Sequence, residues 1–390
     1  MTRVQGKNAE WDDARTLASR CLPPLGQINC SIVEGIGHAL VHDFASLSDV
    51  PPAHTAMMDG YAVCGPAPWP IVGQVHAGQN SAIIETGQAL RVSTGAHIPS
   101  NTLRVIPQES AVVEDGIVTG FVADGNVRKS HIRLPGDEAK KGNIIARAGT
   151  LITPVVAGLL STIGHDVVDV YDQPTIDVIV TGDELIRSGA ARPGAIRDSL
   201  SMQIPSWITW ANARVGSVHV IHDSQRALEK QISASRANII IVTGGSAHGA
   251  RDYARPVLAE LEAELIVDQI KVKPGHPTIL AGLPTHQIVA NLPGNPLAAC
   301  VAFMTVVDPL IYALTGRKPR VLNSAPLATP TTSDRTRVIP VTLGNGVATP
   351  TEFGGSAMLR GLAQADSFAV VEPGIDIVTC RLLPVPWILP

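Results

Sequence analysis

Four carboxylates follow strand-like segments in the second half of the chain and could bind a divalent cation. They are Glu184, Asp198, Asp223 and Asp252. A single residue of this kind is more often a helix cap, and Asp198 and Asp252 are well placed for capping. Several carboxylates at one crevice, beside glycine turns and Lys273, favour Mg²⁺-assisted phosphate chemistry, because Mg²⁺ bridges carboxylates to substrate phosphates. The residues alone leave both interpretations open.

Three turns rich in glycine and proline lie close together in the sequence. They are Gly244-Gly245, Lys273-Pro274-Gly275 and Pro293-Gly294-Asn295-Pro296. The apolar run Ile239–Val242 ends at the first turn and a helical pattern begins near Asp252, an order that brings backbone N–H groups to an anion. Loops at the carboxyl ends of strands in an open α/β sheet meet in one crevice. The sequence therefore predicts a ligand site formed by these turns.

Other nucleotide and hydrolase motifs are missing from the sequence. It contains no G-x-x-x-x-G-K-[ST], no G-x-G-x-x-G and no G-x-S-x-G. The sequence therefore gives no support for a P-loop, a standard dinucleotide-binding fold or a serine hydrolase with a G-x-S-x-G nucleophile turn. Ser246 and His248 are two residues apart on one loop, which is poor evidence for a nucleophile and its base.

The order of elements predicts a multidomain α/β protein. Strands and helices alternate from Thr175 to about Gly316, which indicates a three-layer α/β domain with a mostly parallel sheet, ending in a long apolar helix that Asn295 would cap. Short β-rich runs at Ile71–Val75, Ala89–Ser93, Ala111–Val113 and Ile117–Val122 predict a small β-domain. Beyond Arg320, short Pro-, Thr- and Val-rich strands predict a further β-domain.

Composition excludes several classes of protein. A formal net charge of −4 with mixed charge patterning argues against a nucleic-acid-binding surface. Five scattered cysteines without a C-x-x-C pair are typical of reduced thiols in the cytosol. The polar start of the chain lacks a signal-peptide layout, and we expect no apolar run to approach the roughly 18 residues of a membrane span. We therefore expect a cytoplasmic protein with no membrane partner.

Two further features have simple structural interpretations. His38 and His42 are four residues apart in an apolar-periodic stretch from about Ile32 to Val41, which is metal-ligand spacing on a helix, but no acidic third ligand is evident. They are therefore expected to be surface or packing residues. Asp59-Gly60 is a turn signal, although a carboxylate beside a flexible glycine could also reach into a cleft.

Seven motifs occur in order along the chain. They are Met58-Asp59-Gly60-Tyr61-Ala62, Thr181-Gly182-Asp183-Glu184-Leu185, Ile196-Arg197-Asp198-Ser199, Thr243-Gly244-Gly245, Asp252-Tyr253, Lys273-Pro274-Gly275 and Leu292-Pro293-Gly294-Asn295-Pro296. In this order they resemble the motifs of the MoeA family, the molybdopterin molybdenumtransferases related to the gephyrin E-domain. Thr94-Gly95-Ala96, Asn126-Val127-Arg128 and Gly136-Asp137-Glu138 are also similar. The resemblance covers about residues 14–316, and the remainder matches in position more than in motif.

The resemblance implies a four-part fold and a reaction. The parts would be a molybdopterin-binding α/β domain (1–26 with 174–320), an extended linking domain (27–47 with 140–173), a β-domain carrying Asp59 (48–139) and a C-terminal β-barrel (321–390). The reaction would be insertion of molybdate into adenylylated molybdopterin, with Mg²⁺, in molybdenum cofactor biosynthesis, releasing AMP. The implied partners are a second copy of the chain, in a homodimer, and the molybdopterin adenylyltransferase.

The resemblance also assigns roles to residues. The implied catalytic positions are Asp59, Thr94, Asp137 or Glu138, Glu184, Asp223 and Asp252, and the implied metal ligands are Glu184, Asp223 and Asp252. The implied substrate-binding positions are Thr181, Gly182, Asp198, Ser199, Gly244, Gly245, Ser246, Lys273, Pro274, Gly275, His276, Pro293, Gly294, Asn295 and Pro296. In the family, the β-domain of one subunit reaches the α/β domain of the other, which would give Asp59 a cleft.

Five motifs depart from the family pattern at the expected site. They are Ala56-Met57 for Ser-Ala, Leu200 for Asn, Ala247 for a loop serine, His276 for the second lysine of Lys-Pro-Gly-Lys-Pro, and Ala298 for a serine. Loss of a fixed cation and a hydroxyl weakens oxyanion binding, and a histidine replaces the cation only when it is protonated. A second interpretation is therefore a catalytically weak or inactive paralogue that binds molybdopterin, a nucleotide or a protein without inserting metal.

Overall fold

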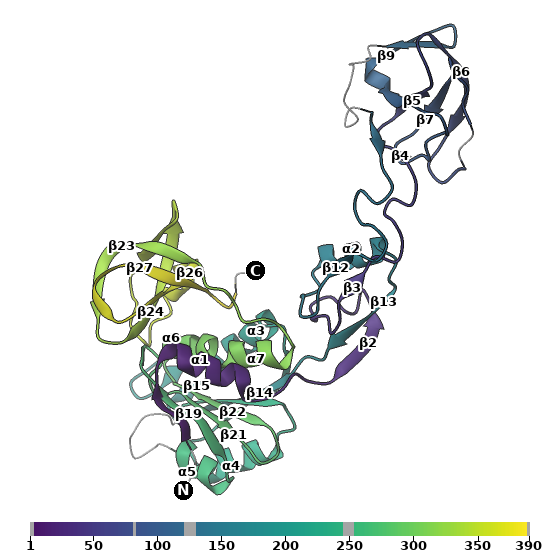
Figure 1. Cartoon of the computed structure of the whole chain (residues 1–390). Coiled ribbons are helices and arrows are strands. Elements are labelled where there is room, and N and C mark those ends of the chain that lie inside the picture. Colours follow the sequence, from purple (N-terminus) through teal and green to yellow (C-terminus); the bar gives the residue numbers. More distant parts are fainter. Residues whose placement is uncertain (1–3, 81–82, 121–129, 245–252, 388–390) are drawn as a thin grey trace. The chain divides into compact units, whose positions relative to one another are not determined.

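The computed structural model describes residues 4–80, 83–120, 130–244 and 253–387. The chain forms two compact units, which are described separately. Unit 1 comprises residues 1–28, 37–41 and 169–390, and unit 2 comprises residues 29–36 and 42–168. Figure 1 labels the elements of both units.

A seven-stranded sheet forms the centre of unit 1. Its order is β1-β19-β21-β22-β18-β14-β17. The strands β14, β17, β18 and β22 run parallel, whereas β21 runs antiparallel to both of its neighbours. The strands are β1 (Val4–Ala9), β14 (Thr175–Thr181), β17 (Arg214–Ile221), β18 (Ile239–Thr243), β19 (Glu264–Ile270), β21 (Ile279–Gly282) and β22 (Ile288–Leu292).

Helices cover both faces of this sheet and confirm the three-layer prediction. One face packs against α1 (Trp11–Arg20), α3 (Leu200–Trp210) and the long helix that starts at Pro296. The other face packs against α4 (Gln225–Ala234) and α5 (Ala254–Glu260). Every residue of β18 and β22 is buried, because a sheet covered on both faces needs apolar side chains on both faces.

The long apolar helix corrects the expectation that no apolar run approaches membrane-span length. It comprises α6 (Pro296–Ala302), a π-helical turn (η3, Phe303–Val307) and α7 (Asp308–Leu314). These 19 residues are long and apolar enough to cross a membrane, but most of the segment is buried in the fold of unit 1. The helix is apolar because it is the core helix of the α/β layer, where it contacts neighbours on all sides.

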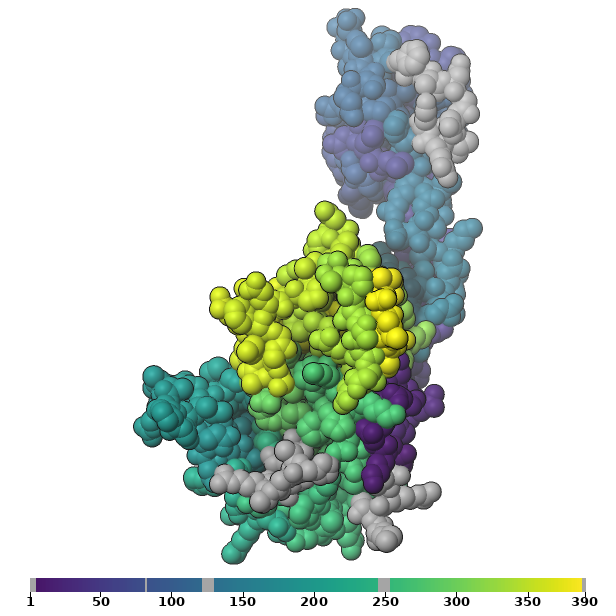
Figure 2. All heavy atoms as spheres, turned by 90° about the vertical axis from the view of Figure 1, so that its left-hand side faces the viewer, coloured from purple at the N-terminus to yellow at the C-terminus, as the bar shows by residue number. Residues whose placement is uncertain are grey.

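The C-terminal part of unit 1 is a closed β-barrel. Its ring is β24-β25-β23-β27-β26, closed by pairing of β26 with β24, and the short strand β20 (Val272–Lys273) joins the start of β24. The strands are β23 (Ser324–Ser333), β24 (Thr336–Gly344), β25 (Val347–Pro350), β26 (Ser367–Val371) and β27 (Gly374–Pro384). Barrel side chains, Phe368 and Val338 among them, share a core with the α/β layers, and Figure 2 shows the barrel in yellow-green against them.

Unit 2 contains the predicted small β-domain. Its six-stranded sheet has the order β8-β5-β7-β6-β10-β9. The strands are β5 (Gly60–Val63), β6 (Trp69–Val75), β7 (Ala89–Val92), β8 (Arg104–Pro107), β9 (Ala111–Glu114) and β10 (Ile117–Gly120). The remainder of the unit has short strand pairs, including β3 (Phe44–Ala45) with β12 (Ile144–Ala146), and the helix α2 (Pro154–Thr162).

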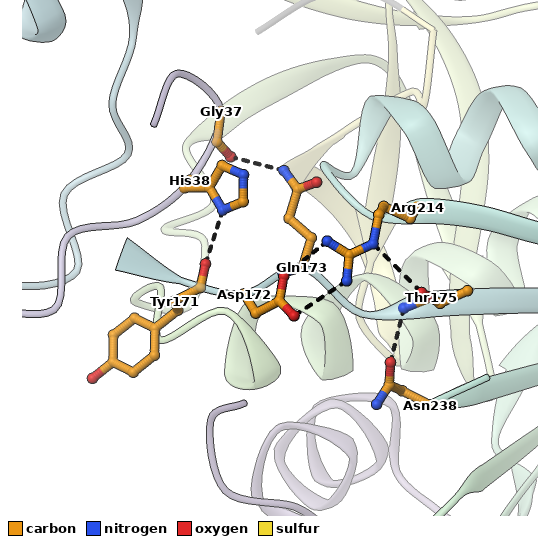
Figure 3. A network of polar contacts seen from close by, with 8 residues as sticks. All are labelled: Gly37, His38, Tyr171, Asp172, Gln173, Thr175, Arg214 and Asn238. Atoms are coloured by element: carbon orange, nitrogen blue, oxygen red, sulfur yellow. Dashed lines mark hydrogen bonds and ion pairs between the residues drawn. The ribbon is translucent and has the colours of Figure 1, made fainter. Parts of the chain in front are cut away.

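The helical pattern expected from Ile32 to Val41 is wrong. Turns occupy residues 32–37, and Leu40 forms a bridge with Val170. Gly37 has φ +88°, a left-handed conformation that ends a regular helix. His38 and His42 are therefore not ligands on one helix face. His38 Nδ1 contacts the Tyr171 carbonyl at 2.9 Å, beside the pair of Asp172 with Arg214 (Figure 3).

Candidate active site

Loops from three parallel strands converge at the carboxyl edge of the seven-stranded sheet. Thr181 Oγ1 donates to the Thr243 carbonyl at 3.2 Å. Gly244 has φ +93°, and a Cβ there would lie 2.6 Å from Thr181 Oγ1. A Cβ on Gly294 would lie 3.6 Å from the Gly244 Cα. The predicted turns therefore meet, and only glycine fits at position 244.

The strand order also makes this edge a place where ligands bind in α/β sheets. From β14 the chain crosses to β17 on one side, and then returns to β18 on the other side of β14. Such a reversal creates a crevice at the carboxyl ends of the two central strands. Thr181 and Gly244 lie at this reversal.

Acidic residues gather where β14 and β17 end. Asp183 Oδ1 accepts a hydrogen bond from the Asp223 backbone N–H at 3.2 Å and lies 3.2 Å from His222 Nδ1. Glu184 follows in the sequence and is exposed. The structure thus brings Glu184 and Asp223 to one edge and adds Asp183, which the sequence analysis quoted but did not select. A carboxylate directly after a buried strand was the signal for it.

The described residues contain no preformed group of three His, Cys, Asp or Glu side chains that could hold a metal ion. The third predicted ligand, Asp252, lies outside the described residues, as do Gly245 and Ser246, the departure Ala247 and the Asn126-Val127-Arg128 motif. Mg²⁺ often uses only one or two carboxylates and completes its shell with water and substrate phosphates. Glu184 and Asp223 supply carboxylate oxygens, the type of ligand that Mg²⁺ takes.

Asp198 caps a helix, as one of the two interpretations predicted. Its Oδ1 accepts from the backbone N–H groups of Leu200 and Ser201 at 3.0 and 3.1 Å, at the start of α3. Ser199 precedes this helix, and its carbonyl accepts from Gln203. The second carboxylate oxygen of Asp198 is buried and has no partner among the described residues.

Unpartnered buried polar groups are concentrated at this edge of the sheet. Within the described ranges, the buried side-chain atoms without a partner are Asp198 Oδ2, Thr243 Oγ1, both amide atoms of Asn291, and Arg381 Nε. All but the last belong to segments at or next to the carboxyl ends of β14, β18 and β22. Native folds rarely leave such groups unpaired, so their clustering marks a site for a polar ligand.

A cavity of about 720 Å³ lies between the α/β part and the barrel of unit 1. The predicted residues Lys273, Pro274, Gly275, His276, Pro293 and Asn295, together with Ala298, form part of its wall. The barrel contributes Arg335, Arg337 and Ser356, which the sequence analysis missed. No motif marked these barrel residues, because their position depends on the pairing of β20 with β24.

Cationic side chains dominate the charge of this cavity. Arg335 forms a two-pronged ion pair with Asp334, with nitrogen–oxygen distances of 3.2 and 2.7 Å. That contact holds the pKa of Asp334 below its ordinary value, and the charge of Lys273 lowers it further. Lys273, Arg335 and Arg337 thus place three fixed cations in the cavity wall, an arrangement suited to an oxyanion.

His276 has a defined orientation in the cavity wall. Its Nδ1 lies 2.8 Å from the Ile270 carbonyl oxygen, and the Ile270 backbone N–H donates to the His276 carbonyl at 3.0 Å. A carbonyl oxygen only accepts, so Nδ1 carries the proton of the neutral ring. Nε2 is therefore the acceptor nitrogen of this tautomer.

Ser356 lies beside Ala298, the position where the family pattern has a serine. The Ala298 backbone N–H donates to the Ser356 carbonyl at 3.2 Å. Asn295 Nδ2 donates to Ser356 Oγ at 3.4 Å, so the Asn295 side chain does not cap the helix that it precedes. Ser356 thus supplies a hydroxyl-bearing residue next to position 298, where the family pattern has a serine and this chain has alanine.

Asp59 and Thr94 are in contact in unit 2. Asp59 Oδ1 accepts from the Thr94 backbone N–H at 2.7 Å and from Thr94 Oγ1 at 2.9 Å. These two bonds lower the pKa of Asp59, and Arg91 adds a smaller effect in the same direction. A Cβ on Gly60 would lie 2.1 Å from the Ile106 carbonyl, so the glycine is required where β5 meets β8. Asp59 is therefore an exposed, ionised and oriented carboxylate.

Asp137 stabilises a turn in unit 2. Its Oδ2 accepts from the Leu134 backbone N–H at 2.7 Å, and its own N–H donates to the Leu134 carbonyl. Glu138 forms an exposed ion pair with Arg133 at 3.2 Å. These contacts do not involve Asp59 or Thr94.

Comparison with known families gives three matches along the chain. Residues 9–164 match the MoeA N-terminal region (domain I and II), residues 177–313 match a probable molybdopterin binding domain, and residues 324–379 match the MoeA C-terminal region (domain IV).

Similar curated proteins and solved structures agree with these matches. A Staphylococcus epidermidis molybdopterin molybdenumtransferase is 30% identical over 313 residues, covering 75% of this chain and 72% of that protein. The Haemophilus influenzae protein of that name is 30% identical over 318 residues, covering 79% and 78%. A crystal structure of the Pyrococcus horikoshii molybdopterin biosynthesis MoeA protein has a TM-score of 0.74 and 26% identity, and covers 96% of this chain and 98% of its own. This chain belongs to the MoeA family.

Proposed function

We propose that this chain is a molybdopterin molybdenumtransferase that inserts molybdate into adenylylated molybdopterin and releases AMP. The observation that carries the proposal is the cationic cavity of Lys273, Arg335 and Arg337. It adjoins the Pro293-Gly294 loop, which also borders the phosphate-type turn at Gly244. Family membership supplies the reaction, and the two neighbouring sites supply places for its two anionic reactants.

Some residues of the chain would bind molybdate and the substrate phosphate, and others would orient the substrate. Lys273 and Arg337 would bind molybdate through charge-assisted hydrogen bonds, with the Ser356 hydroxyl as a further donor. Backbone N–H groups at the glycine turn would bind substrate phosphate. Thr181 borders this turn, and Thr181, Asp198 and Ser199 would orient the substrate.

Mg²⁺ would be held by Glu184, Asp223 and Asp252 and would supply charge neutralisation at the pyrophosphate. Asp183 supports this assignment because it accepts from the Asp223 backbone N–H and so fixes the loop that carries Asp223. In a homodimer, Asp59 of one subunit would reach the other subunit's site, with Thr94 keeping its carboxylate ionised and oriented. Asp137 would act by stabilising its turn.

Apolar side chains on the linking part of unit 2 support the homodimer. Val33, Leu47, Ile144, Val155 and Val167 are exposed there, and Val33 and Val155 are 76% and 81% exposed. Large exposed apolar side chains are often buried in protein–protein contacts, and these five are where such a contact would form. We further propose a cytoplasmic location, and the adenylyltransferase that makes the adenylylated substrate as a transient partner. The four-domain division remains part of this proposal.

Reconstitution tests the proposed reaction. Purified protein, adenylylated molybdopterin, molybdate and Mg²⁺ should release AMP and activate an apo-molybdoenzyme, and Asp59→Asn should abolish both signals. Asp115→Asn, an exposed acid in the turn between β9 and β10, is the matched control and should keep activity. Binding of the nucleotide without either signal, even at millimolar molybdate, would instead identify a binding paralogue.

A further inference from the structure

Asn291 is a buried amide with nothing to bind among the described residues. It is the fourth residue of β22 and is 0% exposed, and neither Nδ2 nor Oδ1 has a hydrogen-bond partner in the described part of the chain. Burying an amide without partners is destabilising, and native proteins rarely do so without a reason. The α4/α5 side of the sheet is otherwise apolar at this level, so an aliphatic residue would pack there without this loss.

Asn291 lies near the carboxyl edge of the seven-stranded sheet, where the loops of the candidate site converge. It pairs in register with Val242 on β18 and with Ile279 on β21. Side chains alternate along a strand, so Asn291 shares the α4/α5 face with Val242 and Val289, and Thr181 is on the same face of β14. Two residues after Asn291 the chain reaches the Pro293-Gly294 turn that meets Gly244. The amide thus lies directly below the convergent loops.

The pair of unpartnered atoms restricts the chemistry of the partner. A phosphate oxygen would accept from Nδ2 and leave Oδ1 unpaired, and a metal ion would bind Oδ1 and leave Nδ2 unpaired. A planar heterocycle with a donor beside an acceptor, as in a lactam or amidine edge, satisfies both amide atoms at once. We propose that Asn291 is a specificity-determining residue that recognises the lactam or amidine edge of a heterocyclic ligand seated at the carboxyl edge of the sheet.

This inference rests on the proposed function, because both halves of adenylylated molybdopterin carry such an edge. The pterin presents a lactam and amino group, and the adenine presents an amidine. A site that hydrogen-bonds a ligand edge with buried polar groups rejects analogues that lack it, since those groups then stay unpaired. Asn291 would therefore lower the stability of the ligand-free chain and raise ligand selectivity.

Asn291→Leu in the full-length chain tests the proposal, because leucine has nearly the shape of asparagine without its polar atoms. The ligand-free variant should unfold at a temperature about 1–3 °C higher than wild type, measured by scanning calorimetry. The affinity of the variant for the heterocycle that Asn291 recognises should fall by about tenfold. Titration calorimetry with AMP and, separately, with neopterin measures this change. Weaker binding of neopterin alone assigns the pterin, and weaker binding of AMP alone assigns the adenine.

Thr305→Val is the matched control. Thr305 is also 0% exposed, but its hydroxyl accepts from Trp11 Nε1 at 3.0 Å and donates to the Val301 carbonyl at 2.7 Å. This variant should unfold at a lower temperature and bind both probes as wild type does. An Asn291→Leu chain that is no more stable than wild type, or that binds both probes unchanged or equally weakened, would overturn the proposal alone. A wild-type chain that binds neither probe would overturn it together with the proposed function.

Discussion

At the scale of single residues, His276 stands in the wall of the oxyanion cavity where the family pattern has a lysine. Its Nδ1 is held by the Ile270 carbonyl, so the neutral ring has Nε2 as an acceptor in the cavity that contains Lys273 and Arg337. A fixed cation at this position should therefore strengthen molybdate binding.

His276→Lys tests this prediction. The variant should bind molybdate more tightly than wild type, by roughly 3- to 30-fold, because lysine carries a permanent charge. Titration calorimetry measures the affinity of both proteins. Equal affinities would show that position 276 does not contact the oxyanion.

Thr94 controls the ionisation of Asp59. The bonds from Thr94 lower the folded-state pKa of Asp59, so their stabilising contribution is present above the ordinary Asp pKa and is lost as the pH falls through the lowered value. Thr94→Val removes the hydroxyl bond and keeps the backbone bond, so the Asp59 pKa should rise partway towards its ordinary value. Carbon-detected NMR titration of Asp59 measures this change, and Thr94→Ser should leave the pKa close to wild type.

At the scale of elements, the glycine turn after β18 depends on close backbone approach. Gly244→Ala would place a Cβ 2.6 Å from Thr181 Oγ1 and 2.8 Å from its carbonyl oxygen, at φ +93°. The free energy of unfolding should fall by about 2–4 kcal/mol, from left-handed strain together with the clash. Gly189→Ala, at φ +78° with nothing within 4 Å, should cost only about 1 kcal/mol. Urea denaturation compares the two, and equal losses would contradict the role of close approach.

A buried ion pair joins the start of α7, inside the core helix, to the segment that follows the helix. Asp308 is 1% exposed and contacts Arg320 at 3.2 and 3.4 Å, and Arg320 also stacks over Trp210 and Tyr312. Asp308→Ala leaves the guanidinium group with aromatic neighbours but no counter-charge, and should destabilise the fold by about 3–5 kcal/mol. Asp334→Ala removes an exposed pair with Arg335 and should lower the free energy of unfolding far less, because solvent screens exposed ion pairs. Similar losses in the two variants would argue against a burial effect.

At the scale of the whole molecule, the proposed homodimer can be tested through the apolar surface of unit 2. Val155 lies in the first turn of α2 and is 81% exposed. Val155→Asp should convert a dimer into a monomer in analytical ultracentrifugation, because an interface core does not tolerate an unpaired charge. Val321→Asp, in an equally exposed position of unit 1 (89%), should leave the dimer intact. Loss of activity in the monomer would support a site shared between subunits.

The sequence by itself determined the layered α/β fold, the β-rich parts and the positions of the turns. Buried parallel strands require continuous apolar runs, and tight turns require glycine, so these features are readable locally at Ile239–Val242 and Gly244. The expected helix at Ile32–Val41 was wrong because backbone bonds to residues 169–171 replace helical ones there. The apolar content of Pro296–Leu314 was underestimated because its burial comes from contacts distant in sequence.

Only the tertiary structure decided which side chains meet. It placed Arg335, Arg337 and Ser356 in one cavity wall with Lys273, paired Asp59 with Thr94, and left Asn291 buried without a described partner. These relations depend on strand order and barrel closure, which join residues tens to hundreds of positions apart. Local sequence patterns report which residues favour a strand or a turn, whereas the contacts of a side chain are fixed by the packing of the whole chain.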